Sequence, residues 1–261
     1  MKTTSNIRRL FFDIETSPNL GIFWRAGYRQ NISYENIVKE RAVICIAWKW
    51  AKDKTVKSAV WDKDQNDKGV LEAFLEDAHV ADELVAHNGD KFDLPWVKTR
   101  CLFHGLQTFP RYKTIDTLQW SRRNFYFNSN RLDYIGRFLG IGGKLETKDG
   151  LWRDVLLRDD RKRLAEMERY NKRDVVLLEQ VYDKLAGHIA PKTHVGVLNG
   201  LEKWTCAYCG SDDVIVNKTR RVTAAGTIQK QMLCQKCGRY YSISMAAFTD
   251  YKNDRAAAST C

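Results

Sequence analysis

The stretch Leu10-Phe11-Phe12-Asp13-Ile14-Glu15-Thr16 is a short apolar run that carries two acids two residues apart. In a β-strand, successive side chains point to opposite faces, so Asp13 and Glu15 share one face, with their Cα atoms about 7 Å apart. Burying two neighbouring anions is costly unless a cation lies beside them. The stretch therefore predicts a strand that ends either in water or at a cation site.

The composition predicts a folded, basic protein. Of 261 residues, 44% are apolar, which is enough for a packed core and excludes a wholly disordered chain. The net charge of +11 favours a polyanionic partner, nucleic acid before a membrane. The sequence has no run of 18 apolar residues and no export signal, so we expect a cytoplasmic protein. In that reducing compartment the seven Cys are expected to be metal ligands or buried thiols before disulfides.

Hydrophobic periodicity predicts an α/β fold. Three consecutive strands joined by loops indicate an antiparallel beginning, and the later alternation of strand and helices indicates a mixed sheet covered by helices. The aromatic and basic segment 17–41 fits either a substrate-facing excursion or a surface loop that packs its own aromatics. The expected strands span residues 7–16, 42–51, 56–61 and 84–86. The expected helices span residues 68–79, 94–104, 114–123, 131–139, 151–157 and 160–187.

Two further acids occupy positions that need a reason. Asp93 follows VAHNGDKF at the start of a predicted helix, where it fits an N-cap or a metal ligand. Asp174 falls in the apolar stripe of the helix 160–187, where a plain carboxylate is unfavourable. Tyr170 lies one turn earlier on the same face, so its hydroxyl can reach the same place. The alternative for Asp174 is a hydrogen bond to a sheet residue.

Together, the motifs FFDIETSP, VAHNGDKFD and YNKRDVVLLEQVY resemble those of the DEDD exonucleases, which have the ribonuclease-H-like fold and include the proofreading domains of DNA polymerases. Tyr170 stands where other members carry His. The chain therefore resembles the DEDDy branch, found in family-B polymerase proofreading domains and in stand-alone phage or bacterial relatives. The resemblance covers residues 7–187 and implies a ribonuclease-H-like mixed sheet flanked by helices.

The resemblance implies an active site for two Mg²⁺ or Mn²⁺ ions about 3.5–4 Å apart. In this site Asp13 would bridge both ions, and Glu15 and Asp174 would complete the site of the ion that activates water. Asp93 would hold the second ion, directly or through water. Tyr170 would orient the attacking water through its hydroxyl.

The reaction implied is 3′→5′ hydrolysis of DNA, at single-stranded or frayed 3′ ends, to nucleoside 5′-monophosphates. Asn88 would contact the terminal nucleotide, and Phe92 would either contact substrate or pack. An RNA 3′→5′ exonuclease remains an alternative, and so does a nucleic-acid-binding or adaptor protein with a silent nuclease site. The expected setting is a stand-alone replication or repair nuclease of phage type, which acts in the host cytoplasm, with replication proteins as candidate partners and no membrane.

A second module follows. Cys206 and Cys209 form one C-x2-C pair, and Cys234 and Cys237 form another, with 24 residues between the pairs. Paired knuckles of this kind predict one structural Zn²⁺ in a small β zinc ribbon. A redox dithiol is the alternative, although it needs only one such pair. The segments VIVNKTRRV and TIQKQML alternate like the strands of a hairpin.

The basic residues of the ribbon suggest its partner. Lys218, Arg220 and Arg221, with Tyr240 and Tyr241, fit a surface that binds the nucleic-acid backbone and stacks bases, although zinc ribbons also dock on proteins. The expected organisation is a nuclease domain over 1–187, a linker over 188–202, the zinc ribbon over 203–245 and a disordered tail over 246–261.

Overall fold

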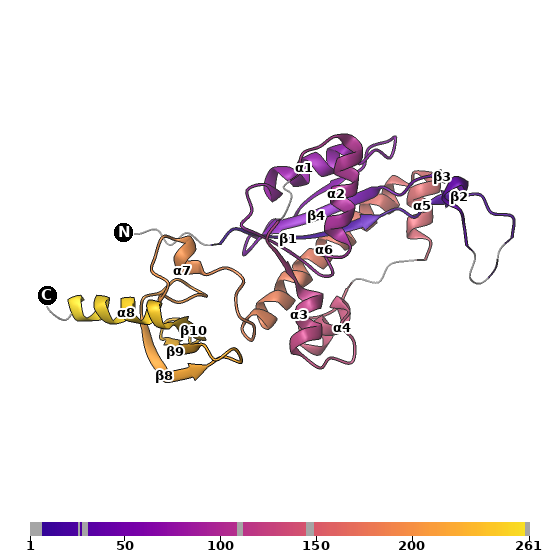
Figure 1. Cartoon of the computed structure of the whole chain (residues 1–261). Helices are drawn as coiled ribbons and strands as arrows, with labels where there is room; N and C mark the ends of the chain where they lie inside the picture. The colour runs from indigo at the N-terminus through magenta and orange to yellow at the C-terminus, as the bar shows by residue number, and fades with distance from the viewer. Residues whose placement is uncertain (1–6, 26, 28–30, 109–111, 145–148, 259–261) are drawn as a thin grey trace. The chain divides into compact units, whose positions relative to one another are not determined.

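In a computed structural model of the chain, the structure describes residues 7–25, 27, 31–108, 112–144 and 149–258; the side chains of 219–221 lie outside this description. The chain divides into two compact units. The first spans Arg8–Leu185, and the second contains the chain from Ala186 onward. Figure 1 shows the elements of both units along the chain.

The first unit is built on a five-stranded sheet with the strand order β5-β4-β1-β6-β7. β1 lies at the centre, antiparallel to β4 and parallel to β6. This arrangement confirms the predicted mixed sheet with an antiparallel beginning. The strands are β1 (Arg9–Thr16), β4 (Val43–Trp50), β5 (Lys57–Val60), β6 (Glu83–Ala86) and β7 (Thr114–Asp116).

Helices cover both faces of this sheet (Figure 1). Phe12 of β1 packs against Phe74 of α1 on one face, with ring centroids 5.0 Å apart. Phe11 lies on the other face, edge-on to Tyr182 of α6 at 5.2 Å. Because side chains alternate along a strand, the two acids of β1 share the face that α6 covers. The helices are α1 (Lys68–Ala78), α2 (Asp93–His104), α3 (Thr117–Asn124), α4 (Leu132–Phe138), α5 (Leu151–Arg158) and α6 (Arg161–Ala186).

One predicted helix is wrong at its beginning. The segment 114–123 was expected to be helical throughout, but Thr114–Asp116 is strand β7, which pairs in parallel with β6. The Asp116 side chain then accepts hydrogen bonds from the backbone N–H groups of Leu118 and Gln119 and so caps α3. The pairing with β6 is a long-range contact, and helical periodicity in a short segment does not reveal it.

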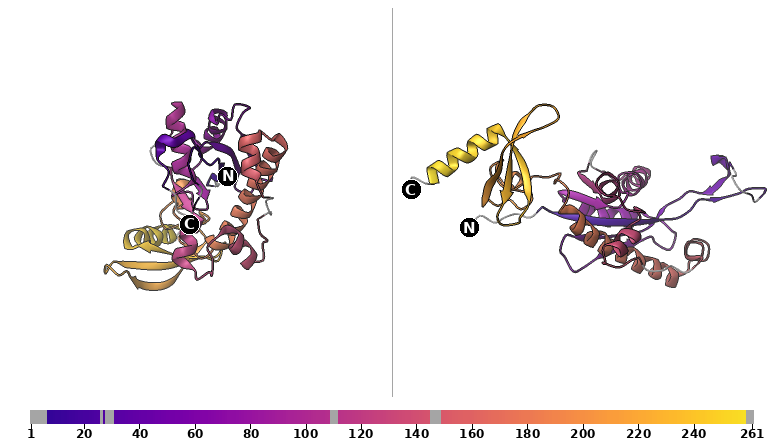
Figure 2. Two further views of the ribbon diagram at one scale, coloured as in Figure 1. Left: turned by 90° about the vertical axis from the view of Figure 1, so that its right-hand side faces the viewer. Right: turned by 90° about the horizontal axis from the view of Figure 1, so that it is seen from below.

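Between β1 and β4 the chain forms a two-stranded arm that projects from the sheet (Figure 2). The arm consists of β2 (Leu20–Gly21) and β3 (Ile37–Lys39), with a short 3₁₀ turn, η1 (Tyr34–Asn36), before β3. Trp24 is 94% exposed, so this ring does not pack within the segment as the surface-loop alternative would require.

The second unit contains a three-stranded sheet with the order β10-β9-β8 and a small core that includes Met232 and Tyr241. The predicted hairpin corresponds to its first two strands, and β10 is an addition. The elements are α7 (Val195–Leu198), β8 (Val214–Val222), β9 (Ile228–Cys234), β10 (Tyr240–Ser244) and α8 (Met245–Ala258).

Two segments flanking the ribbon differ from expectation. Over residues 246–258 the expected disordered tail is instead part of the helix α8, in which Phe248 and Tyr251 pack against the ribbon core, and residues 259–261 lie outside the described residues. The Trp204 indole N–H donates to Asp254 at 2.9 Å and ties the helix down. The expected linker over 188–202 contains α7, and Val195 donates its N–H to the Ala207 carbonyl at 2.9 Å. Only a few apolar side chains mark either segment, so composition did not reveal the packing.

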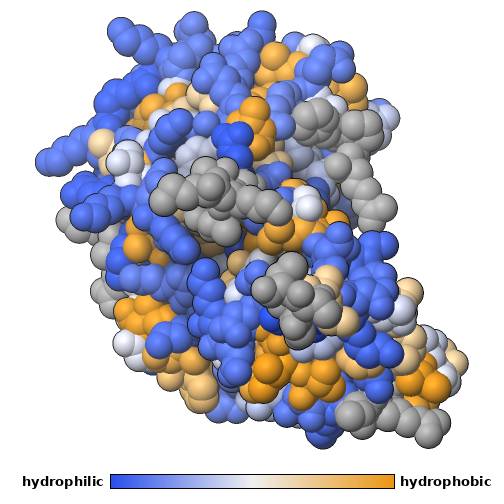
Figure 3. Space-filling view, turned by 90° about the vertical axis from the view of Figure 1, so that its left-hand side faces the viewer, coloured by the Kyte–Doolittle hydropathy of each residue, from blue (hydrophilic) through white to orange (hydrophobic). Residues whose placement is uncertain are grey.

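The surface mixes hydrophilic residues with separate hydrophobic patches on the face drawn in Figure 3. Among the described residues, no helix is both long and apolar enough to cross a membrane.

Candidate functional site

Three carboxylates converge at the carboxyl-terminal half of β1. Asp13 and Glu15 come from that strand and Asp174 comes from α6, and oxygen atoms of the three side chains lie within 4.8 Å of one another. Asp174 is fully buried, and its Oδ1 has no hydrogen-bond partner among the described residues. A buried carboxylate oxygen without a partner is costly unless an ion or a proton satisfies it.

Asp93 lies beside this group but outside the 4.8 Å cluster. It is buried at the first position of α2, and its Oδ1 accepts the backbone N–H of Ile14 at 3.3 Å. β6 pairs with β1 only over Arg9–Phe11 and ends at Ala86, so a side chain supplies the bond where the strand is missing. The N-cap alternative for Asp93 is therefore not how its side chain is used.

The acids strongly perturb one another. Burial, followed by the charge of Asp174, raises the pKa of Asp13 to about 7. Burial and the charge of Asp13 raise the pKa of Glu15 to about 9. Burial also raises the pKa of Asp93 and of Asp174 above the ordinary range. Without a compensating cation, this pocket favours neutral carboxyl groups.

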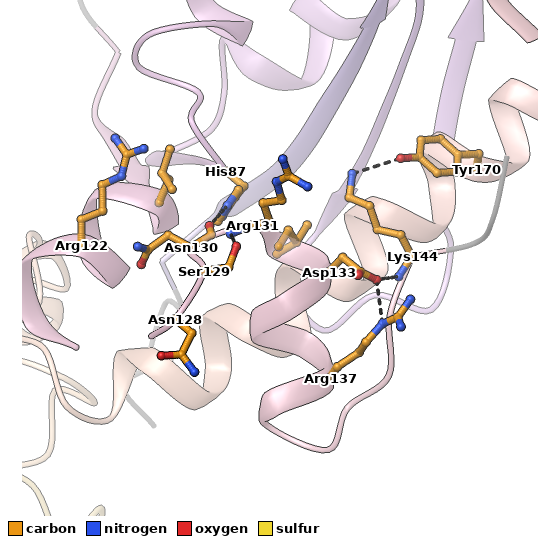
Figure 4. A pocket seen from close by; sticks show the side chains of 12 residues that line it. His87, Arg122, Asn128, Ser129, Asn130, Arg131, Asp133, Arg137, Lys144 and Tyr170 are labelled. Carbon is orange, nitrogen blue, oxygen red and sulfur yellow. Dashed lines mark hydrogen bonds and ion pairs between the residues drawn. The ribbon is translucent and has the colours of Figure 1, made fainter. Parts of the chain in front are cut away.

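Lys144 supplies such a cation, and sequence reasoning missed it. Its ammonium forms an ion pair with Asp174. It also donates to the Tyr170 hydroxyl at 3.2 Å (Figure 4). Burial alone would lower the pKa of Lys144, but the charges of Asp174 and Asp13 raise it above its ordinary value. The same burial, with the charge of Asp174, raises the pKa of Tyr170 to about 12, so its hydroxyl stays protonated at neutral pH.

Glycines bring Lys144 to this place. Gly142 has φ +114°, which a residue with a side chain rarely adopts, and a Cβ on Gly143 would lie 2.4 Å from Asp133 Oδ1. That same oxygen accepts the Lys144 backbone N–H at 2.7 Å. The only feature of the sequence that pointed to this position was the pair Gly142 and Gly143, which lets the backbone approach α4 closely.

A second neighbour holds Asp13. Asn171, fully buried one residue after Tyr170, donates its amide N–H to Asp13 Oδ2 at 2.7 Å. The thiol of Cys45 lies 3.7 Å from the Asn171 Oδ1, and burial raises the pKa of that thiol. Cys45 is therefore a buried neutral thiol, as expected from the sequence, and it helps to orient the Asn171 amide.

A cavity of about 960 Å³ opens next to Lys144 and Tyr170 (Figure 4). Arg122, Arg131 and Arg137 also line it, together with polar side chains such as Asn128 and Ser129. Four cationic side chains and one acid, Asp133, give the wall a positive balance that suits phosphate groups. These arginines lie on separate helices and loops, so their convergence was not visible in the sequence.

His87 forms part of the same wall. Burial lowers the pKa of His87 to about 4, so the ring is neutral at physiological pH. Its Nε2 lies 2.9 Å from the Asn130 carbonyl and its Nδ1 lies 2.9 Å from the Thr117 hydroxyl. The ring thus joins the end of β6 to the loop before α4 and supports the cavity without adding charge.

The predicted substrate contacts Asn88 and Phe92 lie in the turn between β6 and α2. Asn88 has the left-handed φ of 76°, and its N–H donates to Asp116 at 3.0 Å. Phe92 is 40% exposed and lies edge-on to Trp96, with ring centroids 6.4 Å apart. Phe92 directly precedes Asp93 in the chain, and its N–H donates to the Asn88 carbonyl at 3.0 Å.

In the second unit, the sulfur atoms of Cys206, Cys209, Cys234 and Cys237 lie within 4.8 Å of one another. The Cys206–Cys237 and Cys209–Cys234 sulfur distances are 3.7 and 3.6 Å. These distances are far longer than the roughly 2 Å of a disulfide. They fit the separation of about 3.8 Å that follows from Zn–S bonds of about 2.3 Å in a tetrahedral site.

The proposed nucleic-acid contacts of the ribbon are only partly described. Lys218 is exposed on β8, whereas the side chains of Arg220 and Arg221 lie outside the described residues. Tyr240 is 53% exposed, but Tyr241 is buried and its hydroxyl donates to the Trp204 carbonyl at 2.7 Å. The prediction that Tyr241 stacks on bases is therefore wrong, because this ring of β10 lies in the ribbon core.

The comparisons with known proteins agree with this architecture. Residues 10–186 match the family model RNase_H_2, described as RNase_H superfamily. The match covers more than half of the chain, and the chain belongs to the RNase_H superfamily. No curated protein matches the sequence.

Among solved structures, the fold is similar to the family B DNA polymerase from the hyperthermophilic archaeon Pyrobaculum calidifontis. The TM-score is 0.54 at 16% sequence identity, and the match covers 70% of this chain and 25% of that chain. The family match confirms the ribonuclease-H-like fold, and the part of this chain that matches the polymerase spans about a quarter of the polymerase's length.

The two donor sets fit different ions. The carboxylate cluster offers hard oxygen donors, including the unpartnered Oδ1 of Asp174, which suit Mg²⁺ or Mn²⁺. The four thiols offer a closed soft set that suits Zn²⁺.

Lys144→Met should make the folded protein depend more strongly on divalent ions, because the buried acids lose their cation. Breaking a buried pair costs about 3–5 kcal/mol, and the 32% exposure of the Lys144 side chain places the effect at the lower end. In Mg²⁺-free buffer, we expect the melting temperature of Lys144→Met to lie several degrees below that of wild type. Saturating MgCl₂ should raise the melting temperature of the variant by more than it raises that of wild type. Calorimetry of zinc-loaded protein checks this.

Lys68→Met provides the matched control, because Lys68 pairs with Glu72 at 3.8 Å with both side chains 51% exposed. It should melt like wild type in either buffer. Identical melting of Lys144→Met and wild type in Mg²⁺-free buffer would contradict a compensating role for Lys144.

Proposed function

We propose that this protein is a metal-dependent 3′→5′ exonuclease of the DEDDy type that acts on single-stranded or frayed DNA ends. The observation that carries the proposal is the convergence of Asp13, Glu15 and Asp174 around an unpartnered carboxylate oxygen, with the Tyr170 hydroxyl one helical turn away. Membership of the RNase_H superfamily supports nuclease activity in general.

The acids would hold two Mg²⁺ or Mn²⁺ ions. After burial, the charge of Asp13 is the factor that most raises the pKa of both Glu15 and Asp93, which suits a bridging ligand. Asp93 would serve the second ion, since it borders Asp13 but lies outside the tight cluster. Two ions bound in such a site activate the attacking water and stabilise charge on the leaving 3′ oxygen.

The remaining residues act on orientation and protons. Tyr170 keeps its proton at neutral pH, so its hydroxyl can donate a hydrogen bond and position the attacking water. Asn171 holds the Asp13 carboxylate through the 2.7 Å bond and leaves the other oxygen of Asp13 for an ion. Lys144, once released from Asp174, is placed to meet a phosphate oxygen at the mouth of the cavity.

The basic cavity supports a polyanionic chain as substrate. Arg122, Arg131 and Arg137 can contact phosphates next to the cleaved bond. Asn88 and Phe92, in the turn before Asp93, stay the proposed contacts of the terminal nucleotide. An RNA 3′→5′ exonuclease would use the same groups, because the contacts named here are to phosphates and bases and not to a 2′-hydroxyl.

For the ribbon we propose one structural Zn²⁺ and an accessory role in nucleic-acid binding. The support is the exposed Lys218 and the half-exposed Tyr240 on a basic module, features that suit backbone contact and stacking. A protein-docking ribbon is the alternative that the last test in this section addresses.

The first test is turnover of end-labelled DNA and RNA oligonucleotides with Mg²⁺, Mn²⁺ or no divalent ion. Wild type should shorten DNA from its 3′ end and release nucleoside 5′-monophosphates. Asp174→Asn keeps the shape of the side chain but removes an anionic ligand, so it should abolish turnover while folding is retained. Wild-type rates in Asp174→Asn would refute the metal site, and an inactive wild type would favour a silent nuclease site.

Tyr170→Phe should lower the single-turnover rate by about 10²–10³, by analogy with the loss of one preorganised donor from an active site. The ring and its packing remain, so substrate affinity should barely change. Rapid-quench kinetics and a binding titration separate the two effects. A variant that loses affinity but keeps the wild-type rate would make Tyr170 a substrate contact instead.

The triple variant Lys218→Ala/Arg220→Ala/Arg221→Ala should weaken binding of single strands without loss of zinc. Each phosphate contact removed should lower the slope of log affinity against log salt by about 0.7. Binding titrations at several salt concentrations, with zinc content as the control, provide the measurement. An unchanged slope would indicate a ribbon that docks on a protein.

A further inference from the structure

A second cavity lies on the outer face of α2, away from the basic cavity described above. It has a volume of about 520 Å³ and is lined by Trp96, Thr99 and Phe103 of α2 together with Lys39 and Arg41 from the base of the arm. Glu40 also lines it, so its charged side chains are mostly cationic.

At this cavity, an arginine guanidinium group packs against each of two aromatic rings. The Arg41 guanidinium lies 4.5 Å from the centre of the Trp96 ring, and the Arg100 guanidinium lies 4.4 Å from the Phe103 ring. Phe103 is nevertheless 71% exposed. An exposed ring beside a guanidinium group is the arrangement that stacks a nucleobase and pairs with its phosphate.

Arg100 is fixed in place from below. Its Nε and Nη2 donate to the two oxygens of Asp67 at 2.7 and 2.9 Å, and Asp67 is fully buried. His104 lies 2.6 Å from the same carboxylate. Burial alone would raise the pKa of Asp67, but the hydrogen bonds from Arg100, the Val43 N–H and His104 lower it below its ordinary value, so the carboxylate stays charged. Phe103 therefore rests on a rigid support, which reduces the entropy lost when a ligand stacks on it.

The row of rings begins at Phe92, next to Asp93 in the chain. α2 starts at Asp93, and Phe92 lies edge-on to Trp96. Phe103 is ten residues beyond Asp93, which corresponds to about 15 Å along a helix. At about 3.4 Å per nucleotide, this length accommodates roughly four or five nucleotides of one strand.

We propose that the outer face of α2 is a stacking surface for substrate bases several nucleotides away from the cleaved bond, with Phe103 and Trp96 as platforms and Arg41 as a phosphate contact. The ligand class is single-stranded nucleic acid, read without sequence preference. This inference rests on the proposed nuclease function and extends its substrate from a terminal nucleotide to a segment of strand.

The test compares a trinucleotide with a decanucleotide that has the same 3′ sequence. Phe103→Ala should weaken binding of the decanucleotide about tenfold and leave that of the trinucleotide unchanged, because only the longer strand reaches the ring. Phe103→Trp should restore binding. Fluorescence anisotropy in the Asp174→Asn background measures these affinities without turnover, and cleavage kinetics of Phe103→Ala in the otherwise wild-type protein should show a raised KM for the decanucleotide alone.

Leu102→Ala is the matched control, because Leu102 is 82% exposed on the same helix but does not line the cavity. It should bind both oligonucleotides like the parent. The proposal would be overturned if Phe103→Ala weakened binding of both oligonucleotides equally or of neither. It would also be overturned if Leu102→Ala weakened binding as much as Phe103→Ala does, which would favour an apolar protein-docking face. If wild type cleaves neither oligonucleotide but Phe103→Ala still weakens binding of the decanucleotide alone, the proposed nuclease function is refuted and the stacking surface is retained.

Discussion

Repulsion among buried acids is the constraint on which the first unit is organised. Asp13, Glu15 and Asp174 lie within 4.8 Å, and Asp93 adds a further charge at the side of β1. Such a group is tolerated only when hydrogen bonds and cations surround it. The long helix α6 supplies Asn171, and the glycine loop supplies Lys144. The stabilisation of the buried acids therefore brings together elements that lie far apart in the sequence.

Part of this arrangement could be predicted from the sequence. Strand and helix periodicities placed the acids on the right elements, because the alternation of β1 and the apolar stripe of α6 are local properties. The cation was not predictable, since nothing distinguishes Lys144 from the other basic residues until the loop packs against α4. β7 and α8 were missed for a related reason: their stability depends on pairing with β6 and on packing against Trp204.

The two candidate metal centres differ in their donor atoms and in what lies beside them. The thiol cluster is closed by two knuckles, in which the N–H groups of Gly210 and Gly238 bond back to the carbonyls of Cys206 and Cys234 at 2.8 and 2.9 Å. The carboxylate cluster lies beside Lys144 and Tyr170, which line a large basic cavity. A set of four soft donors suits a structural ion, whereas hard oxygen donors beside a basic cavity suit an ion that keeps water or phosphate in its coordination sphere.

The bond between Asp93 and the Ile14 N–H has a consequence for association. A strand with unpaired backbone groups can recruit an extended segment of another molecule. β1 loses its β6 partner after Phe11, so this side of the central strand would otherwise present such an opening next to the acids. The Asp93 carboxylate, at the first residue of α2, accepts the Ile14 N–H and so leaves that donor unavailable to another strand. The acid proposed to serve catalysis thus also opposes the addition of a strand from another molecule at this side of β1.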